Sequence, residues 1–417
     1  MLKKIKLNVN KNIKFIIINL IINLVLLFSI EPGRSISSWG LSIWSVFFFI
    51  QFVFFGFLIT KKSSSILYIF FYNLYFILIL NFLFTPLLSK YTNYPSLSKN
   101  ISVKFQIKDK EMYGFNDGIS VLTTDDKGFR TNKKINYNFK PKNSLRLAVI
   151  GASQAEEIYI DDNEIWSNLL SKKIEIDTNL NVEMINTGIS GSGVNEHLKT
   201  MQYLISLKNI DHFIFVFGQN DWNKYLFKNN LSSLNNFFYY FSFRDSLLMK
   251  LFTFLNFEIF SKDATKIKII ADRYAKNQSG SLSNRTLSNN KLNEIPIEYK
   301  TKVLKILELC KINELQCTFL ESFNAYKHNV DINLKNNFWM TPPNVKYSLS
   351  LDDLIYVSEL FNSWLKSEVK KNKLNFCKVE NNLEASKKYF YDDSHLNPNG
   401  SKKLSEIIFQ CLKHNLK

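Results

Sequence analysis

Three polar residues have types that suit acyl transfer, and they lie where such chemistry is usually placed. Ser153 and Asn220 each follow an apolar, strand-like run, and His395 lies in a late loop three residues after Asp392. A serine hydroxyl can act as a nucleophile, an imidazole beside a carboxylate can act as a base, and a neutral amide can donate to an oxyanion. The chain is therefore predicted to be an enzyme that cleaves or transfers an acyl group.

Each of these features also has a structural explanation that the sequence leaves open. Ser153 can be a helix cap, and the loop around His395 can be a solvated turn before a helix. The glycine-rich segment 188–193 can be a simple turn, although its glycines also let backbone N–H groups approach a substrate. Its spacing does not fit a nucleotide-binding loop, and the cysteine spacing fits no zinc pattern. The sequence therefore predicts neither a cofactor nor a metal.

The apolar pattern predicts the elements that must position these residues. Strand-like and helix-like segments alternate from residue 145 to the C-terminus, which predicts an α/β domain over 145–417 with helices on both faces of a parallel sheet. Five strands are expected at about residues 145–150, 182–186, 212–217, 317–321 and 375–379, and helices at about 163–173, 194–207, 297–311, 352–370 and 399–412. Ligands gather at the carboxyl ends of parallel strands, so Ser153, 188–193 and Asn220 should share one edge.

Two stretches depart from this alternation. Residues 90–144 are polar and rich in turn signals, and they are expected to form a linker with some short strands. Residues 222–293 are expected to be an insertion, with an aromatic-rich amphipathic part followed by a part rich in serine and asparagine. The amphipathic part could pack against the domain, cover the active site or lie on a membrane.

Residues 1–89 are expected to form a transmembrane region. Three apolar stretches are each close to the about 20 residues that a helix needs to cross a bilayer. They lie at about residues 13–30, 39–60 and 66–88. Lysines precede the first stretch and fill the short connection before the third, so the positive-inside rule places the N-terminus in the cytoplasm. The catalytic domain then lies on the extracytoplasmic side of the cytoplasmic (inner) membrane. A cleaved signal peptide within residues 1–37 is the alternative for the first stretch.

The distribution of charge argues against a nucleic acid partner. The 417 residues carry a formal net charge of +17, but lysine is scattered and no basic stripe interleaved with aromatic residues is present, so no nucleic acid partner is expected.

The four cysteines all lie in the domain expected on the extracytoplasmic side, where an oxidising compartment would permit disulfides. They are Cys310, Cys317, Cys377 and Cys411. Three pairings are open if all are bridged, and free buried thiols are an equal alternative.

Four short motifs, taken in order, resemble the four blocks of the SGNH/GDSL hydrolase superfamily. Gly-x-Ser ends at Ser153, Asn-x-x-Ile-Ser-Gly ends at Gly191, Gly-x-Asn-Asp contains Asn220, and Asp-x-x-His ends at His395. The segment 127–130, Lys-Gly-Phe-Arg, is similar to one that precedes the first block in many bacterial members. The resemblance covers the chain from about residue 125 to the C-terminus.

The resemblance implies a three-layer, flavodoxin-like α/β/α domain. The implied catalytic residues are Ser153 as nucleophile, His395 as base and Asp392 as the group that orients the base, and the implied oxyanion hole is formed by the Ser153 N–H, the Gly191 N–H and the Asn220 side chain. Ala152 stands where the family usually has an aspartate, and this departure affects the expected geometry and rate of the first block.

Three functions are compatible with the sequence. The first is a serine esterase or deacylase that acts on an acyl ester of an envelope glycan or lipid. The second is an O-acyltransferase that modifies an extracytoplasmic polysaccharide together with a multi-spanning acyltransferase partner in the membrane. The third is a noncatalytic glycan-binding protein, which the departure at Ala152 suggests.

Overall fold

The structure is a computed structural model of the chain. It describes residues 94–97, 99–107, 114–115, 118–229, 268–269, 286–287, 292–335, 338, 347–379 and 382–413. The chain divides into two units, residues 1–92 with 232–262 and residues 93–231 with 263–417, and the described residues all belong to the second. The three expected transmembrane spans, between residues 13 and 88, lie outside the described residues. Among the helices that the structure describes, none is both long and apolar enough to cross a membrane.

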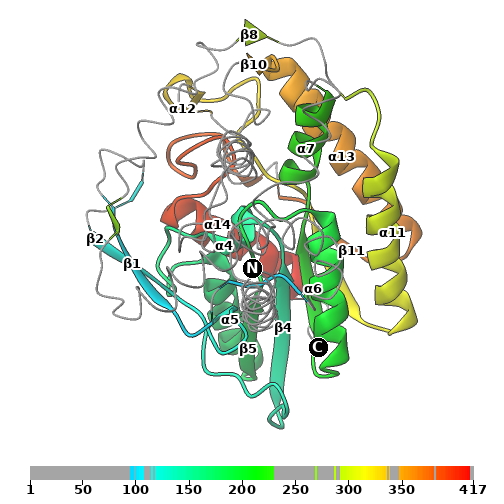
Figure 1. Ribbon diagram of the computed structural model, residues 1–417. Helices are drawn as coiled ribbons and strands as arrows, with labels where there is room; N and C mark the ends of the chain where they lie inside the picture. The colour runs from blue at the N-terminus through cyan, green and yellow to red at the C-terminus, as the bar shows by residue number, and fades with distance from the viewer. Residues whose placement is uncertain are drawn as a thin grey trace, which may run out of the picture. The chain divides into compact units, whose positions relative to one another are not determined.

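A six-stranded sheet lies at the centre of this unit (Figure 1). Its strands follow the order β11-β9-β6-β4-β5-β3. The five parallel strands are β4 (Ser144–Ile150), β5 (Asn181–Asn186), β6 (His212–Val216), β9 (Gln316–Leu320) and β11 (Asn375–Cys377). In chain order these five strands are arranged 2-1-3-4-5, which is the flavodoxin-like topology. The five expected strands are therefore all present, and each observed end lies within two residues of the expected one.

The sixth strand corrects the expectation of a purely parallel, five-stranded sheet. β3 (Arg130–Thr131) pairs antiparallel with β5, with Arg130 opposite Asn186 and Thr131 opposite Ile185. The sheet is therefore mixed. The prediction was wrong at this edge because a strand of two residues is too short to show the alternating pattern by which strands are recognised in a sequence.

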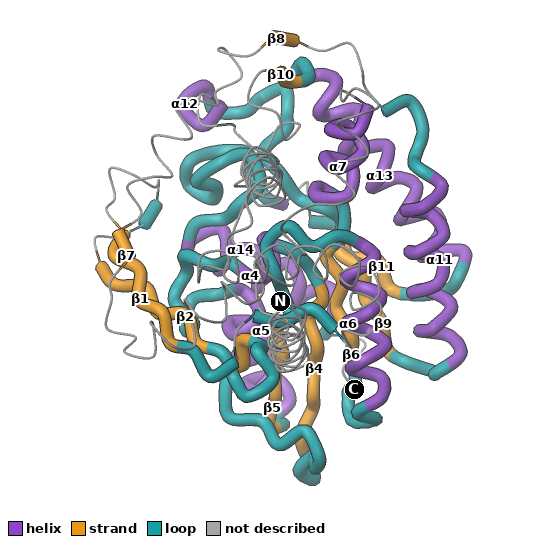
Figure 2. Tube along the Cα trace, viewed as in Figure 1, coloured by secondary structure: helices purple, strands orange, loops and turns teal. Residues whose placement is uncertain are grey.

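Helices cover both faces of the sheet. The main helices are α5 (Trp166–Thr178), α6 (Val194–Ser206), α11 (Ile297–Ile312), α13 (Leu351–Lys371) and α14 (Pro398–Leu412). From β4 the chain steps one way to β5 through α5 and back the other way to β6 through α6, and since such crossovers are right-handed, α5 and α6 lie on opposite faces. α14 packs on α5, and α11 packs on α6 (Figure 2). The result is the expected three-layer arrangement.

The part of residues 90–144 that the structure describes packs against the loops of the sheet. β1 (Ser102–Ile107) and β2 (Gly118–Thr123) form an antiparallel pair, and β7 (Lys268–Ile269), from the expected insertion, adds parallel to β1. Apolar side chains of this stretch, among them Phe105 and Phe115, form a second small core with Ile160, Ile189 and Tyr391. Residues near the N-terminal end of the unit therefore contact the loops that follow β4 and β5 and precede α14.

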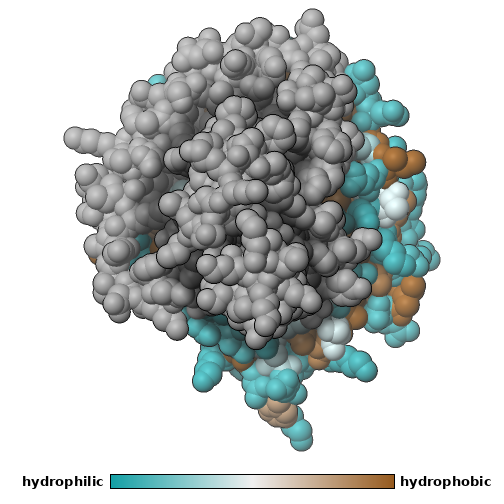
Figure 3. All heavy atoms as spheres, viewed as in Figure 1, coloured by the Kyte–Doolittle hydropathy of each residue, from teal (hydrophilic) through white to brown (hydrophobic). Residues whose placement is uncertain are grey.

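The visible described surface mixes hydrophobic and hydrophilic residues without a large apolar area (Figure 3). The exposed apolar side chains on α11 are Ile297, Leu304 and Ile312. They are spaced along the helix and alternate with charged residues, as scattered surface hydrophobes commonly are. They give no reason to expect a docking face on this helix.

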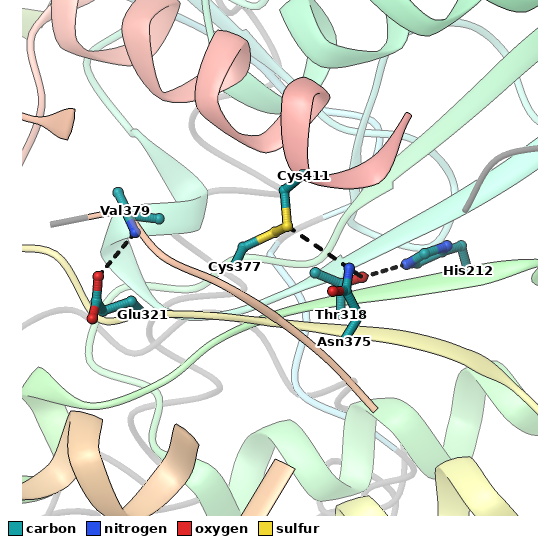
Figure 4. Close-up of a disulfide and its surroundings, with 7 residues drawn as sticks. All are labelled: His212, Thr318, Glu321, Asn375, Cys377, Val379 and Cys411. Carbon is teal, nitrogen blue, oxygen red and sulfur yellow. Dashed lines mark hydrogen bonds between the residues drawn. A yellow bond between two sulfur atoms is a disulfide. The ribbon is translucent and has the colours of Figure 1, made fainter. Parts of the chain in front are cut away.

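Two disulfides fasten the half of the sheet that lies beyond β6. Cys310 of α11 is bonded to Cys317 of β9, and Cys377 of β11 is bonded to Cys411 of α14 (Figure 4). Beside the second disulfide, the hydroxyl of Thr318 accepts a hydrogen bond from Asn375 at 3.0 Å and lies 2.8 Å from Nε2 of His212. Among the three pairings that the sequence left open, the chain therefore adopts the one that joins each strand to a neighbouring helix.

Candidate active site

Ser153 lies just beyond the carboxyl end of β4. It is the first residue of α4 (Ser153–Glu156), and the cap of that helix is Ala152, whose side chain makes no capping bond. The carbonyl of Ala152 accepts the N–H groups of Ala155 and Glu156 at 3.0 and 2.9 Å. Ser153 is therefore not the cap of this helix. α4 comprises four residues, so the macrodipole of a long helix does not assist Ser153.

Asn220 lies on the same pocket as Ser153. It is the second residue of α7 (Gln219–Asn229), and its amide donates to the carbonyl of Ser192 at 3.0 Å. The pocket is lined by Ser153, Ser192, Gly218, Asn220 and Ser394, among others. A primary amide carries two N–H donors, and the bond to Ser192 uses one of them. The three loops after β4, β5 and β6 thus meet at the edge of the sheet where ligands of such folds gather.

Asp392 and His395 form a buried pair next to this pocket. Nδ1 of His395 lies 2.9 and 2.8 Å from the two carboxylate oxygens of Asp392. Oδ1 of Asp392 also accepts the backbone N–H groups of Ser394 and His395, at 2.9 and 2.7 Å. Asp392 is fully buried and His395 is 7% exposed. With the proton on Nδ1 directed at the carboxylate, Nε2 is left as the basic nitrogen.

The structure also shows how the ring of His395 is held from the side. Tyr391 stacks on it with ring centroids 5.6 Å apart and planes inclined by 11°. Phe115 in turn packs edge-on against Tyr391, with centroids 5.5 Å apart. This contact could not be predicted from the sequence, because Phe115 lies in the segment expected to be a linker.

Gly191 lies beside the pocket and is not among the residues that line it. Its φ of +80° is in the left-handed region that favours glycine, and the next residue, Ser192, both lines the pocket and accepts the bond from Asn220. The preceding residue, Ser190, donates its backbone N–H and its hydroxyl to the carboxylate of Glu156. The loop that contains Gly191 is therefore tied to α4 on one side and to Asn220 on the other.

Arg130 is a further residue that supports the site. Its guanidinium is buried and donates to the backbone carbonyls of Glu156, Glu157 and Ile160, all in the chain that leaves Ser153. It also forms a salt bridge with Asp162 at 2.6 Å. The match of residues 127–130 to the resembled family was the only sign of it in the sequence. Arg130 thus supplies donors to buried carbonyls of this turn, of which that of Glu157 also accepts the N–H of Ile160 at 2.9 Å.

His197 and Glu157 titrate differently from ordinary side chains. His197 lines the pocket and stacks on Phe217, and burial lowers its pKa to about 4, so its imidazole is neutral at physiological pH. Burial raises the pKa of Glu157 to about 8, although hydrogen bonds from Trp166 and Ser401 oppose this shift.

Within the described residues, no group of histidine, cysteine, aspartate and glutamate side chains has an arrangement that could hold a metal ion.

Comparison with known proteins gives likenesses of fold alone. No family model matches the sequence, and no curated protein matches it. A member of the lipolytic protein G-D-S-L family from Veillonella parvula is 12% identical with a TM-score of 0.34, and the match covers 64% of this chain and 97% of that one. A GDSL-like lipase from Bacteroides thetaiotaomicron is 12% identical with a TM-score of 0.34, covering 65% and 89%. An acetylxylan esterase from Geobacillus stearothermophilus is 10% identical with a TM-score of 0.36, covering 65% and 96%. Similarity at this level carries no argument about catalysis, which depends on the geometry of the site.

Proposed function

We propose that this chain is a serine ester hydrolase of the SGNH type. The observation that carries the proposal is the buried Asp392–His395 pair beside a pocket that Ser153 and Asn220 both line. The same residue types are arranged for nucleophilic attack on a carbonyl in serine hydrolases of several unrelated folds. Asp392 would fix the orientation and tautomer of His395, and His395 would act as the base for Ser153.

The proposed reaction has two steps. Oγ of Ser153 attacks the ester carbonyl, its proton passes to Nε2 of His395, and the bond to the alcohol breaks as His395 returns the proton to the leaving oxygen. Water then attacks the acyl-enzyme with the same base. The N–H groups of Ser153 and Gly191 and the amide of Asn220 would stabilise the oxyanion of each step. Each such donor is typically worth about 10²–10³ in rate.

Hydrolysis of short p-nitrophenyl esters by the purified full chain tests the proposal. We expect Ser153→Ala to abolish turnover, because the nucleophile is lost. Ser206→Ala is the matched control, since Ser206 is an exposed helical serine whose hydroxyl donates only to a carbonyl of its own helix. A fluorophosphonate probe should label Ser153 in the unmodified protein. Absence of both turnover and labelling, over several acyl lengths, would reject the hydrolase and favour the glycan-binding alternative.

We further propose that the substrate is an acyl ester of an envelope glycan or lipid, and that the chain is held in the cytoplasmic membrane with this domain outside. The apolar stretches and lysine pattern of residues 1–89 support this location, and so do the two disulfides, which persist mainly in oxidising compartments. Alkylation of intact cells that express the full chain tests it. If the four cysteines react without prior reduction, the proposed compartment is wrong.

Transfer to a sugar hydroxyl is the second candidate, because an alcohol could resolve the acyl-enzyme on Ser153 in place of water. The membrane region expected at residues 1–89 favours it, since a multi-spanning partner in the same membrane could deliver the acyl group from the cytoplasm. Products of the reaction with a polysaccharide acceptor distinguish the two functions. Free acid alone supports hydrolysis, whereas an acylated acceptor supports transfer.

A further inference from the structure

The loop that follows β9, residues 321–326, contains none of the proposed catalytic residues, and yet it contacts the loops that contain Ser153, Asn220 and His395. The carbonyl of Phe323 accepts a hydrogen bond from the side chain of Gln154, which directly follows Ser153. The same amide nitrogen of Gln154 lies 3.3 Å from the carbonyl of Ser394, the neighbour of His395. Both bonds are buried. The residue after the nucleophile is thus held by the β9 loop and by the histidine loop together.

Tyr326 connects the other two parts of the site. Its hydroxyl accepts a hydrogen bond from the side chain of Gln219 at 3.0 Å and donates one to the carboxylate of Asp393 at 2.5 Å. Gln219 precedes Asn220 in the chain, and Asp393 lies two residues before His395. Tyr326, Gln219 and Asp393 are all at least nine-tenths buried. A single hydroxyl therefore joins the loop of the oxyanion donor to the loop of the base.

The position of this hydroxyl is itself fixed on several sides. The ring of Tyr326 packs edge-on against Trp222 of α7 and against Phe338, with centroids 5.8 and 5.4 Å apart. The backbone N–H of its neighbour Ala325 donates to the carbonyl of Asp393 at 2.9 Å. Because both the ring and the backbone are held, loss of the hydroxyl alone would remove its bonds to Gln219 and Asp393 while the rest of the loop keeps its packing.

We propose that Tyr326 is a positioning residue that holds Asn220 and His395 in the relative geometry that acyl transfer needs. The proposal rests on the function proposed above. Asn220 and His395 come from elements far apart in the sequence, and a misplacement of about 1 Å between groups that act on one carbonyl can cost about 10²-fold in rate. Tyr326 acts through its neighbours, so its effect should appear in the chemical step more than in substrate binding.

Tyr326→Phe tests the proposal in the full chain, because it removes the hydroxyl and keeps the ring. We expect kcat for a short p-nitrophenyl ester to fall about 10-fold or more, with KM within about twofold of the unmodified value. The matched control is Tyr137→Phe. Tyr137 is also buried, and its hydroxyl also donates to a carboxylate, that of Asp125, but it precedes β4 at the opposite end of that strand from Ser153.

Three outcomes decide the proposal. A fall in kcat for Tyr326→Phe that Tyr137→Phe does not show supports it. An unchanged kcat for Tyr326→Phe overturns it. An equal fall in both variants, in parallel with their thermal stability, also overturns it, because the hydroxyl would then be only a general contributor to the fold.

A spectroscopic measurement separates failure of this proposal from failure of the proposed function. The proton that His395 shares with Asp392 should give a nuclear magnetic resonance downfield of the amide protons, whether or not the chain turns over an ester. If the unmodified chain hydrolyses nothing, the hydrolase proposal fails. Loss or broadening of this signal in Tyr326→Phe alone would still support the positioning role, whereas an unchanged signal would overturn it.

Discussion

Asp392 holds His395 through both its ring and its backbone, and this double role makes one substitution informative. In Asp392→Asn the amide oxygen can still accept the backbone N–H groups of Ser394 and His395, so the turn should keep its shape. The amide nitrogen, however, would face Nδ1 and favour the wrong tautomer of the imidazole. We expect kcat for ester hydrolysis to fall on the order of 10³–10⁴-fold with little change in KM.

Asp211→Asn is the matched control for this substitution. The carboxylate of Asp211 also accepts a backbone N–H, that of Arg146 at 2.7 Å, and Asp211 lies at the opposite end of the sheet. Its variant should keep the unmodified kcat. A kcat for Asp392→Asn within tenfold of the unmodified value would show that the carboxylate does not act on the base.

The residues of the candidate site could be picked out in the sequence, because they stand shortly after apolar runs or within three residues of each other. Ser153, Asn220, Asp392 and His395 meet that condition. The supporting contacts could not be predicted, since they join residues far apart in the chain. Tyr326 is 107 residues from Gln219 and 67 from Asp393, for example. A local sequence pattern carries no information about contacts between residues so far apart.

The two disulfides should stabilise their elements unequally. The bond between β11 and α14 closes a loop with a sequence separation of 34, and the bond between α11 and β9 closes one of 7. A longer loop loses more entropy in the unfolded chain, and the expected contributions are about 4 and about 2 kcal/mol. Cys377→Ala with Cys411→Ala should therefore lower the free energy of unfolding more than Cys310→Ala with Cys317→Ala. Urea unfolding of both double variants measures the order, and an inverted order would contradict the loop-length argument.

The elements themselves show where sequence patterns suffice. α6 and α11 begin at the predicted residues, because their apolar periods are long and a glycine or a proline stands just before each of them. β3 and α4 have two and four residues and are too short to carry a period. Both lie beside the site. The smallest elements, whose conformation is imposed by tertiary contacts such as those of Arg130, are thus the ones that sequence reasoning misses.

For the unit as a whole, buried titratable groups should confine stability to a middle range of pH. Burial lowers the pKa of His197 and of His212 to about 4. Each histidine is neutral in the fold and gains a proton in the unfolded chain below about pH 6.5, so each removes stability as the pH falls from 6.5 to 4. Glu157 has the opposite effect, because its pKa is raised and its protonated form is the one that the fold favours.

Glu157→Gln should flatten the alkaline side of this profile. In the unfolded chain Glu157 ionises near pH 4.5, whereas in the fold it keeps its proton to about pH 8. Its contribution to stability is therefore complete below 4.5 and is lost at about 1.4 kcal/mol per pH unit as the pH rises to 8. Glutamine stays neutral and can still accept from Trp166 and Ser401, so the variant should lose this slope. Denaturant unfolding between pH 5 and 8 measures the slope of the free energy of unfolding against pH.

The control variant is Glu164→Gln, at an exposed position in the same loop, which should keep the unmodified slope. Equal slopes for Glu157→Gln and the unmodified chain would mean that Glu157 is ionised in the fold.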